Sequence, residues 1–475
     1  MTLLEQLRRY GESGACPMHM PGHKRADLDG PLPWGLDITE IDGFDNLHDA
    51  QGILQEGMDR AARLYGSDRA FYLVNGSTCG ILAGVCAAAR PGDTVLLSRG
   101  CHKSVYHALE LRELVPVYLT APLDPASGVT ASLPPQAVAD ALAAHPEAKL
   151  LIVTSPTYEG VCSDLKSIVV LAHGAGVPVL IDAAHGAHLG FSSAFPGGAV
   201  GSGADIVIQS LHKTLPSLTQ TSLAHWNRGL VDGDEFARQL SIFETSSPSY
   251  LLMGSIDRCV DLLERRGPEL FAAYEQNLAA FDQAIAGLHH LRVLCHGGDR
   301  LADHPGFFAF DPGKLVISTR GTDLTGPALM ERLRREDTIE LEMAMGDYAL
   351  AMTSICDTEE SLSRLAAALL RIDGDLQSVP VPVPPAALPL PERRLLISQA
   401  RRLPGEAVPL AEAVGRISGE MVWAYPPGVP LLVPGEVLSP ELAAVLRDLA
   451  ARGVRLHGEH SCPLETVWVL KNCGL

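Results

Sequence analysis

The sequence lacks the features typical of membrane, secreted and nucleic-acid-binding proteins. Its 10 cysteines are scattered along 475 residues without a Cys-x-x-Cys pair, so neither a disulfide framework nor a structural zinc site is predicted. There is no secretory leader at residues 1–5, and no uncharged apolar run approaches the ~18 residues that cross a bilayer. The formal charge of -19 opposes binding to phosphate backbones. We therefore expect a cytoplasmic protein without nucleic-acid or membrane partners.

The chain has enough hydrophobic residues to form a large core. Hydrophobic residues make up 47% of it, which is enough for two or three domains. Between Ser77 and Trp226, short β-branched runs alternate with helical stretches, and this alternation predicts parallel βα units in an α/β fold. The expected strands are 94–97, 115–119, 150–154, 177–181, 206–208 and 222–225, and the expected helices include 79–89 and 164–174.

The rest of the chain predicts further units. Residues 234–290 are expected to be helical, and a second α/β pattern runs from 304 to 372. Residues 378–385 are rich in proline and predict an extended linker. The predicted divisions are an N-terminal arm (1–50), a large domain (51–300), a small domain (301–375), a linker (376–390) and a tail domain (391–475).

Polar clusters follow three of the expected strands, at residues 154–158, 182–185 and 209–213. Open α/β sheets bind ligands beyond the carboxyl ends of their strands, so these clusters predict one site at one edge of the sheet. Lys213, with Ser210 and His212 before it, suits a Schiff base to a cofactor whose phosphate the neighbours hold. The alternative is a plain surface charge, as most lysines are.

Asp182 closes the strongest expected strand. A carboxylate there needs a cationic or hydrogen-bonding partner, and a pyridinium nitrogen would be one. Taken singly, an aspartate at a strand end more commonly caps a loop. Gly76, Ser77 and Thr78 open a helix, so their N–H and hydroxyl groups could receive a phosphate, although ordinary helix capping would use the same residues.

Three histidines are further candidates. His102 lies beyond an expected strand end, where an imidazole could stack on a flat ring, although most loop histidines do not. His185 and His188 have the spacing of a His-x-x-His metal pair, but no glutamate completes a zinc-protease pattern. Metal ligation is therefore the less favoured interpretation.

Together these motifs resemble the bacterial ornithine/lysine/arginine decarboxylase family of fold-type I pyridoxal-phosphate (PLP) enzymes, over nearly the whole chain. The resemblance implies a mainly parallel, seven-stranded sheet and PLP-dependent decarboxylation of arginine, lysine or ornithine in polyamine biosynthesis. It is carried by residues 17–24, 39–43, 75–78, 101–104, 182–188 and 210–214, and by 425–428 with 434–436 in the tail.

The resemblance also implies roles at the cofactor. Lys213 forms the Schiff base, Asp182 pairs with the pyridine nitrogen and His102 stacks on the ring, while His185 contacts its far edge. A segment containing Thr245 and Ser246 reaches the phosphate from a neighbouring subunit, which implies a homodimer or a dimer of dimers with shared sites. The phosphate cradle comprises Ser77, Thr78, Ser210 and His212, at the helix that Gly76 opens.

Two positions depart from the family pattern. Ala183 stands where many short members have glutamate, and Pro216 replaces a small residue after the lysine. The chain begins at the family core without an amino-terminal wing domain, so the decamers of the large members are not expected.

Substrate and reaction stay open at this stage. Glu159, Glu342 and Asp347 are candidates for reading the distal cation of the substrate, and each could instead be a surface carboxylate. Arginine is the favoured substrate. The alternatives are another PLP reaction on the same scaffold, a non-catalytic PLP-binding paralogue, or a metal-dependent hydrolase built on His102, His185 and His188.

Overall fold

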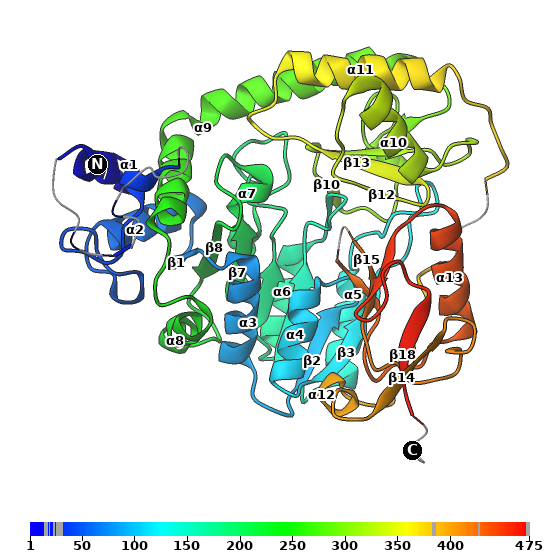
Figure 1. The fold of residues 1–475 in the computed structure, drawn as a ribbon, viewed down its shortest axis with the longest axis horizontal. Helices are drawn as coiled ribbons and strands as arrows, with labels where there is room; N and C mark the ends of the chain where they lie inside the picture. The colour runs from blue at the N-terminus through cyan, green and yellow to red at the C-terminus, as the bar shows by residue number, and fades with distance from the viewer. Residues whose placement is uncertain are drawn as a thin grey trace.

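A seven-stranded sheet forms the centre of the molecule (Figure 1). The computed structural model describes residues 1–13, 18, 20–21, 24, 32–381, 386–425 and 428–471; parts of the 17–24, 378–385 and 425–428 motifs lie outside these residues. In sheet order, the strands are β1 (Arg69–Leu73), β8 (Ser222–Trp226), β7 (Ile206–Ser210), β6 (Val179–Asp182), β4 (Leu150–Thr154), β2 (Thr94–Ser98) and β3 (Val115–Leu119).

One strand runs against the others. β8 pairs antiparallel with both β1 and β7, so the prediction of parallel βα units is wrong at this last strand. The 11 residues between β7 and β8 hold only the short helix α7 (Leu211–Thr214), and a parallel crossover needs a dozen or more. The chain therefore turns back at once, which places Ser222, the first residue of β8, opposite Ser210, the last residue of β7.

Helices bury both faces of the sheet. Along β7, Ile206 and Ile208 face one helical layer and Val207 faces the other, as the two-residue period of a strand requires. Glycine lets α3 approach closely, because a Cβ at Gly80 would lie 2.8 Å from the Ile208 side chain. The first layer holds α3 (Gly76–Ala88), α4 (Lys103–Leu111) and α8 (Gly233–Phe243), and the second holds α5 (Pro135–Ala144) and α6 (Leu165–Gly174).

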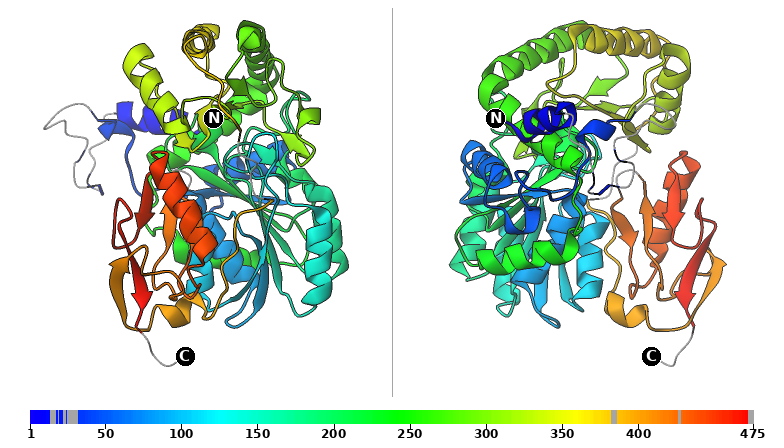
Figure 2. Two further views of the ribbon diagram at one scale, coloured as in Figure 1. Left: turned by 90° about the vertical axis from the view of Figure 1, so that its right-hand side faces the viewer. Right: turned by 60° about the vertical axis from the view of Figure 1, so that its left-hand side comes forward.

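A long helix leads from the central sheet to a second one. α9 (Tyr250–Ala284) packs against α11 (Glu359–Asp373), and the two form an arch at one end of the molecule (Figure 2). Beneath the arch lies a four-stranded sheet with the order β12-β13-β11-β9. Its elements are β9 (Arg292–Val293), β11 (Lys314–Ser318), α10 (Gly326–Asp337), β12 (Met343–Met345) and β13 (Tyr348–Met352).

The C-terminal part stands beside the central sheet (Figure 2) and has its own apolar core. Arg99, which follows β2, donates to the carbonyl of Leu431 (3.1 Å) and to the buried carboxylate of Glu436 (3.0 Å), and these bonds attach the C-terminal part to the sheet. Its elements are α12 (Ile397–Ala400), β14 (Gly405–Pro409), β15 (Val422–Ala424), β16 (Pro430–Leu432), α13 (Pro440–Ala451), β17 (Leu456–Gly458) and β18 (Thr466–Leu470).

The predicted domain boundaries at residues 51, 301, 376 and 391 stay a proposal. The second sheet includes the edge strand β9, which lies just before the predicted boundary at 301. Within the described part of the chain, no helix combines the length and the apolarity that crossing a membrane requires.

Candidate active site

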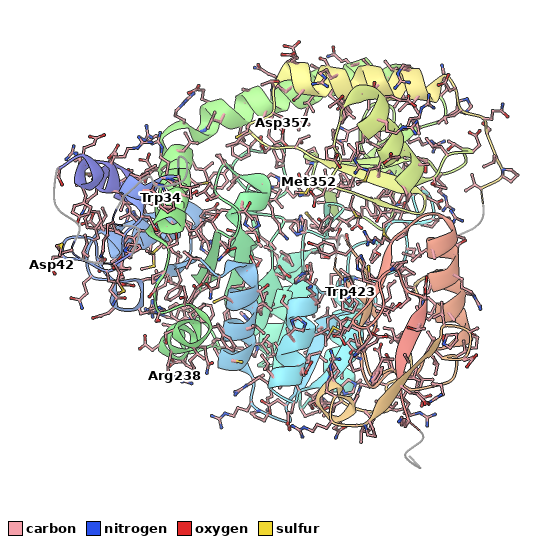
Figure 3. The ribbon with its side chains drawn as sticks, viewed as in Figure 1. Trp34, Asp42, Arg238, Met352, Asp357 and Trp423 are labelled. Carbon is pink, nitrogen blue, oxygen red and sulfur yellow. The ribbon has the colours of Figure 1, made fainter. Side chains whose placement is uncertain are left out.

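A cavity of about 1070 Å³ opens at the carboxyl ends of the central strands. The central sheet, the second sheet and the C-terminal part all contribute to its walls. Figure 3 labels Met352, which lines the cavity from the end of β13, and Trp423 of β15, the strand whose last residue, Ala424, also lines it. Nine of the residues predicted to be catalytic or to bind the cofactor line this cavity: Gly76, Ser77, Thr78, His102, Asp182, His185, Ser210, His212 and Lys213.

Lys213 is a half-buried amine on α7, directly after β7. Its Nζ lies 3.0 Å from Nε2 of His185. Burial lowers the pKa of Lys213, although the nearby Asp182 opposes the shift. A larger fraction of this amine is therefore neutral than of a surface lysine, and the neutral form is the nucleophile that attacks a carbonyl carbon.

Asp182 ends β6 and is 4% exposed. It accepts a hydrogen bond from the N–H of Ala184 at 3.1 Å. Burial raises the pKa of Asp182, and the charge of Lys213 opposes this. A buried carboxylate with so little compensation is stabilised by a second cationic group, as a protonated pyridine ring would be.

Three hydroxyl groups meet at the N-terminus of α3. Ser77 Oγ lies 2.6 Å from Ser210 Oγ and donates to Ser222 Oγ at 3.1 Å. The N-terminus of a helix carries unpaired N–H groups and partial positive charge, so this hydroxyl cluster suits a phosphate. Sequence reasoning missed Ser222, because a parallel β8 would have started at the opposite edge of the sheet.

His102 caps α4. Its Nδ1 accepts a hydrogen bond from the N–H of Ser104 at 3.2 Å, so the ring proton sits on Nε2. Burial, with the charges of Lys213 and Lys103, lowers the pKa of His102 to about 3. The ring is therefore a neutral, flat group in the cavity wall. Lys103 donates its N–H to the carbonyl of Gly428 at 3.2 Å, which fixes the C-terminal part beside this ring.

His185 is also neutral, and its carbonyl is bonded to a buried network of Lys314, Asp311 and His188. Burial, with Lys213 and Lys314, holds the pKa of His185 well below its usual range. Lys314 is 1% exposed, and its Nζ donates to the carbonyl of His185 at 3.4 Å and to Asp311 at 3.3 Å. Asp311 also lies 3.1 Å from Nε2 of His188. His188 thus belongs to this network, and the two histidines face different partners. No sequence signal distinguished Lys314 from other lysines.

Three carboxylates lie farther out along the cavity: Glu159, Glu342 and Asp347. Tyr348 donates to Glu159 at 2.7 Å. Asp347 pairs with Arg452 of the C-terminal part. Glu342 accepts a hydrogen bond from Tyr158, whose ring centroid lies 4.3 Å from that of His185. Of the three, Glu342 is the one close enough to raise the pKa of Lys213, against the larger lowering by burial.

Two predicted residues lie elsewhere. Thr245 and Ser246 are exposed in the connection between α8 and α9 and do not line the cavity of their own chain. The carbonyl of Thr245 lies 2.8 Å from Nε2 of His48. Any contact of this segment with a cofactor would therefore be made in another subunit.

The chain is similar to a family of known enzymes in sequence and in fold. Residues 2–326 match the family model described as Orn/Lys/Arg decarboxylase, major domain, and residues 397–453 match the C-terminal domain of the same family. An arginine decarboxylase of Bacillus subtilis (strain 168) is 34% identical over 98% of this chain and 96% of its own length.

Lysine decarboxylases are also similar to this chain, at lower sequence identity. The constitutive lysine decarboxylase of Escherichia coli (strain K12) is 26% identical and matches 86% of this chain and 69% of its own length. The crystal structure of the Francisella novicida lysine decarboxylase LdcF shares the fold, with a TM-score of 0.81 at 19% identity over 99% of this chain and 81% of that one.

Proposed function

The chain belongs to the Orn/Lys/Arg decarboxylase family, and from this premise we propose that it uses PLP to remove the α-carboxylate of a basic L-amino acid, arginine in the first place. The observation that carries the proposal is the amine of Lys213, which lies 3.0 Å from a neutral imidazole at the carboxyl edge of the sheet, close to Asp182. A lysine so placed is suited to bond formation with an aldehyde.

The chemistry of the donor groups fits PLP. Lys213 would hold the cofactor covalently, and Asp182 would pair with its pyridine nitrogen. Ser77 and Ser210 would bind its phosphate at the N-terminus of α3, with Thr78 and His212 beside them, and the fully buried Ser222 would hold the hydroxyl of Ser77 in position. When bound, PLP supplies a protonated ring that accepts the electron pair left as carbon dioxide departs.

The side chains of the protein orient the reaction and move its protons. His102 has a neutral ring in the cavity wall and would pack against the flat ring of the cofactor without adding charge. His185, also neutral, lies within hydrogen-bond distance of Nζ of Lys213. Nζ of Lys213, when not bonded to the cofactor, would be able to give a proton to the α-carbon, because its pKa is lowered by burial.

Glu342 is our candidate for binding the distal cation. It is a cavity carboxylate whose charge is felt at Lys213, and it makes no ion pair among the described residues, whereas Asp347 is paired with Arg452. We favour arginine because the full-length relative at 34% identity is named as an arginine decarboxylase.

Thr245 and Ser246 support a homodimer, or a dimer of dimers, whose sites are shared between subunits. They are exposed and lie outside the cavity of their own chain, as residues that serve a neighbouring site must. We also propose a cytoplasmic role in polyamine biosynthesis, since decarboxylation of a basic amino acid yields an amine of that kind.

A panel of carboxyl-labelled arginine, lysine and ornithine tests the function. We expect release of labelled carbon dioxide and the matching amine, fastest with arginine. Formation of a keto acid or an aldehyde would instead show another PLP reaction, and cofactor binding without any turnover would show a non-catalytic paralogue. If turnover depended on a chelatable metal and not on PLP, a hydrolase would replace this proposal.

A further inference from the structure

A second group of ligand-type side chains lies outside the cavity, in the segment that follows β9. Cys295, Asp299 and His304 each offer one ligand atom, and these three atoms lie within 4.8 Å of one another. None of the three lines the cavity described above. The group mixes a thiol, a carboxylate and an imidazole within ten residues.

The imidazole of His304 is held in a fixed orientation. It is 2% exposed and stacks on Phe307, with 4.9 Å between the ring centroids. Nδ1 lies 2.8 Å from the fully buried carboxylate of Asp124, and Nε2 lies 2.7 Å from Asp299. This is the arrangement found at metal-binding histidines, where a carboxylate fixes one ring nitrogen and the other ligates the ion.

The surroundings of Cys295 favour a cation. Its N–H donates to Asp299 at 2.7 Å, which closes the loop that brings the thiol and the carboxylate together. The ring nitrogens of His304 lie 2.8 Å and 2.7 Å from the carboxylates of Asp124 and Asp299, and the negative charge of these two groups beside the thiol favours a divalent ion. One oxygen of Asp124 has no hydrogen-bond partner within the described ranges.

We propose that Cys295, Asp299 and His304 bind one Zn²⁺ ion, with Asp124 as the positioning residue for the imidazole. A set of one sulfur, one nitrogen and one oxygen ligand suits zinc, and water completes four-coordination. Binding displaces the thiol proton of Cys295 and the Nε2 proton that His304 shares with Asp299, so protons are released and no redox partner is needed. The sequence predicts no structural zinc site because it has no Cys-x-x-Cys pair, and this group contains a single cysteine.

The site would reinforce a link between two segments far apart in the sequence. All three ligands lie in the segment that follows β9, and one of them, His304, is bonded to Asp124. Asp124 belongs to the loop that also holds Ser127 and Gly128, which line the cavity. By holding the His304 ring in place, the ion would stabilise the attachment of this part of the cavity wall. This role is independent of the proposed decarboxylation.

Cobalt substitution tests the site in the full-length protein as purified. After chelation and dialysis, we expect about one Co²⁺ per chain, with the visible bands of a tetrahedral ion and a thiolate charge-transfer band. Cys295→Ser should abolish the charge-transfer band, and Asp124→Asn should weaken binding roughly 10- to 100-fold. Cys356→Ser, at an exposed cysteine elsewhere, should change neither.

Two results would overturn the proposal. One is Co²⁺ or Zn²⁺ uptake that is the same in Cys295→Ser as in the unaltered protein. The other is no uptake at all, in which case His304 only joins two carboxylates. If the variants do not fold, X-ray absorption of the zinc-loaded, unaltered protein decides the question, since a first shell without sulfur contradicts the site.

Discussion

The two ends of the cavity differ in the charge of their side chains. We call the part around Lys213 the inner end and the part around Glu342 the outer end. At the inner end, burial keeps His102 and His185 neutral and lowers the pKa of Lys213, so the charged forms of these three groups are disfavoured. The outer end holds Glu159, Glu342 and the Asp347–Arg452 pair. Under the proposed function, one continuous cavity would combine a site for nucleophilic chemistry with a site for recognising a cation.

Removing the inner amine should have the largest effect. Lys213→Ala takes away the only group that we propose bonds to the cofactor, so we expect no measurable carbon dioxide release and no absorbance of protein-bound PLP in the visible range. Lys166→Ala, at an exposed lysine of α6, is the matched control and should keep both. Turnover by the Lys213 variant would remove the basis of the proposed function.

Glu342→Gln tests the outer end alone. A hydrogen bond to a charged group contributes about 1.5–3 kcal/mol, so kcat/KM for arginine should fall roughly 10- to 100-fold, mainly through KM. Glu159→Gln, at the cavity carboxylate that, unlike Glu342, has no part in raising the pKa of Lys213, should cost less. Equal losses in the two variants would mean that Glu342 does not read the distal cation. The differences in kcat/KM between arginine, lysine and ornithine should also become smaller in Glu342→Gln and stay unchanged in Glu159→Gln.

Lys314→Met and Glu342→Gln should shift the pH dependence of PLP association in opposite directions. The charge of Lys314 lowers the pKa of Lys213, and that of Glu342 raises it. Because the neutral amine reacts with the aldehyde, PLP association should move to higher pH in Lys314→Met and to lower pH in Glu342→Gln. Stopped-flow absorbance of the apoprotein mixed with PLP measures both shifts. Shifts of the same sign would contradict the electrostatic account of the inner end.

Ser222→Ala should have the smallest effect. Loss of one neutral hydrogen bond contributes about 0.5–1.5 kcal/mol, so PLP should bind roughly 3- to 10-fold more weakly, with kcat nearly unchanged at saturating cofactor. Ser241→Ala, at an exposed serine of α8, is the control. If PLP affinity were the same in both variants, the bond between Ser222 and Ser77 would have no part in holding the phosphate.

The side chains that follow the strands of the central sheet were largely predictable from the sequence, and the contacts made between separate sheets were not. Lys213, Asp182 and Ser210 could be found because each follows a run of apolar residues, and parallel strands bring their carboxyl ends to one edge. Ser222 was missed because the direction of β8 depends on the short connection before it. Lys314 and Arg452 reach their partners by packing between separate sheets, which leaves no local pattern.

The central claim is tested most directly by locating the cofactor on the chain. The protein is loaded with PLP, reduced with borohydride, digested and mapped by mass spectrometry. We expect the reduced cofactor on the peptide that contains Lys213, at close to one per chain, and on no other lysine in comparable amount. Full occupancy of another lysine, with Lys213 unmodified, would contradict the account of the inner end and the reaction built on it.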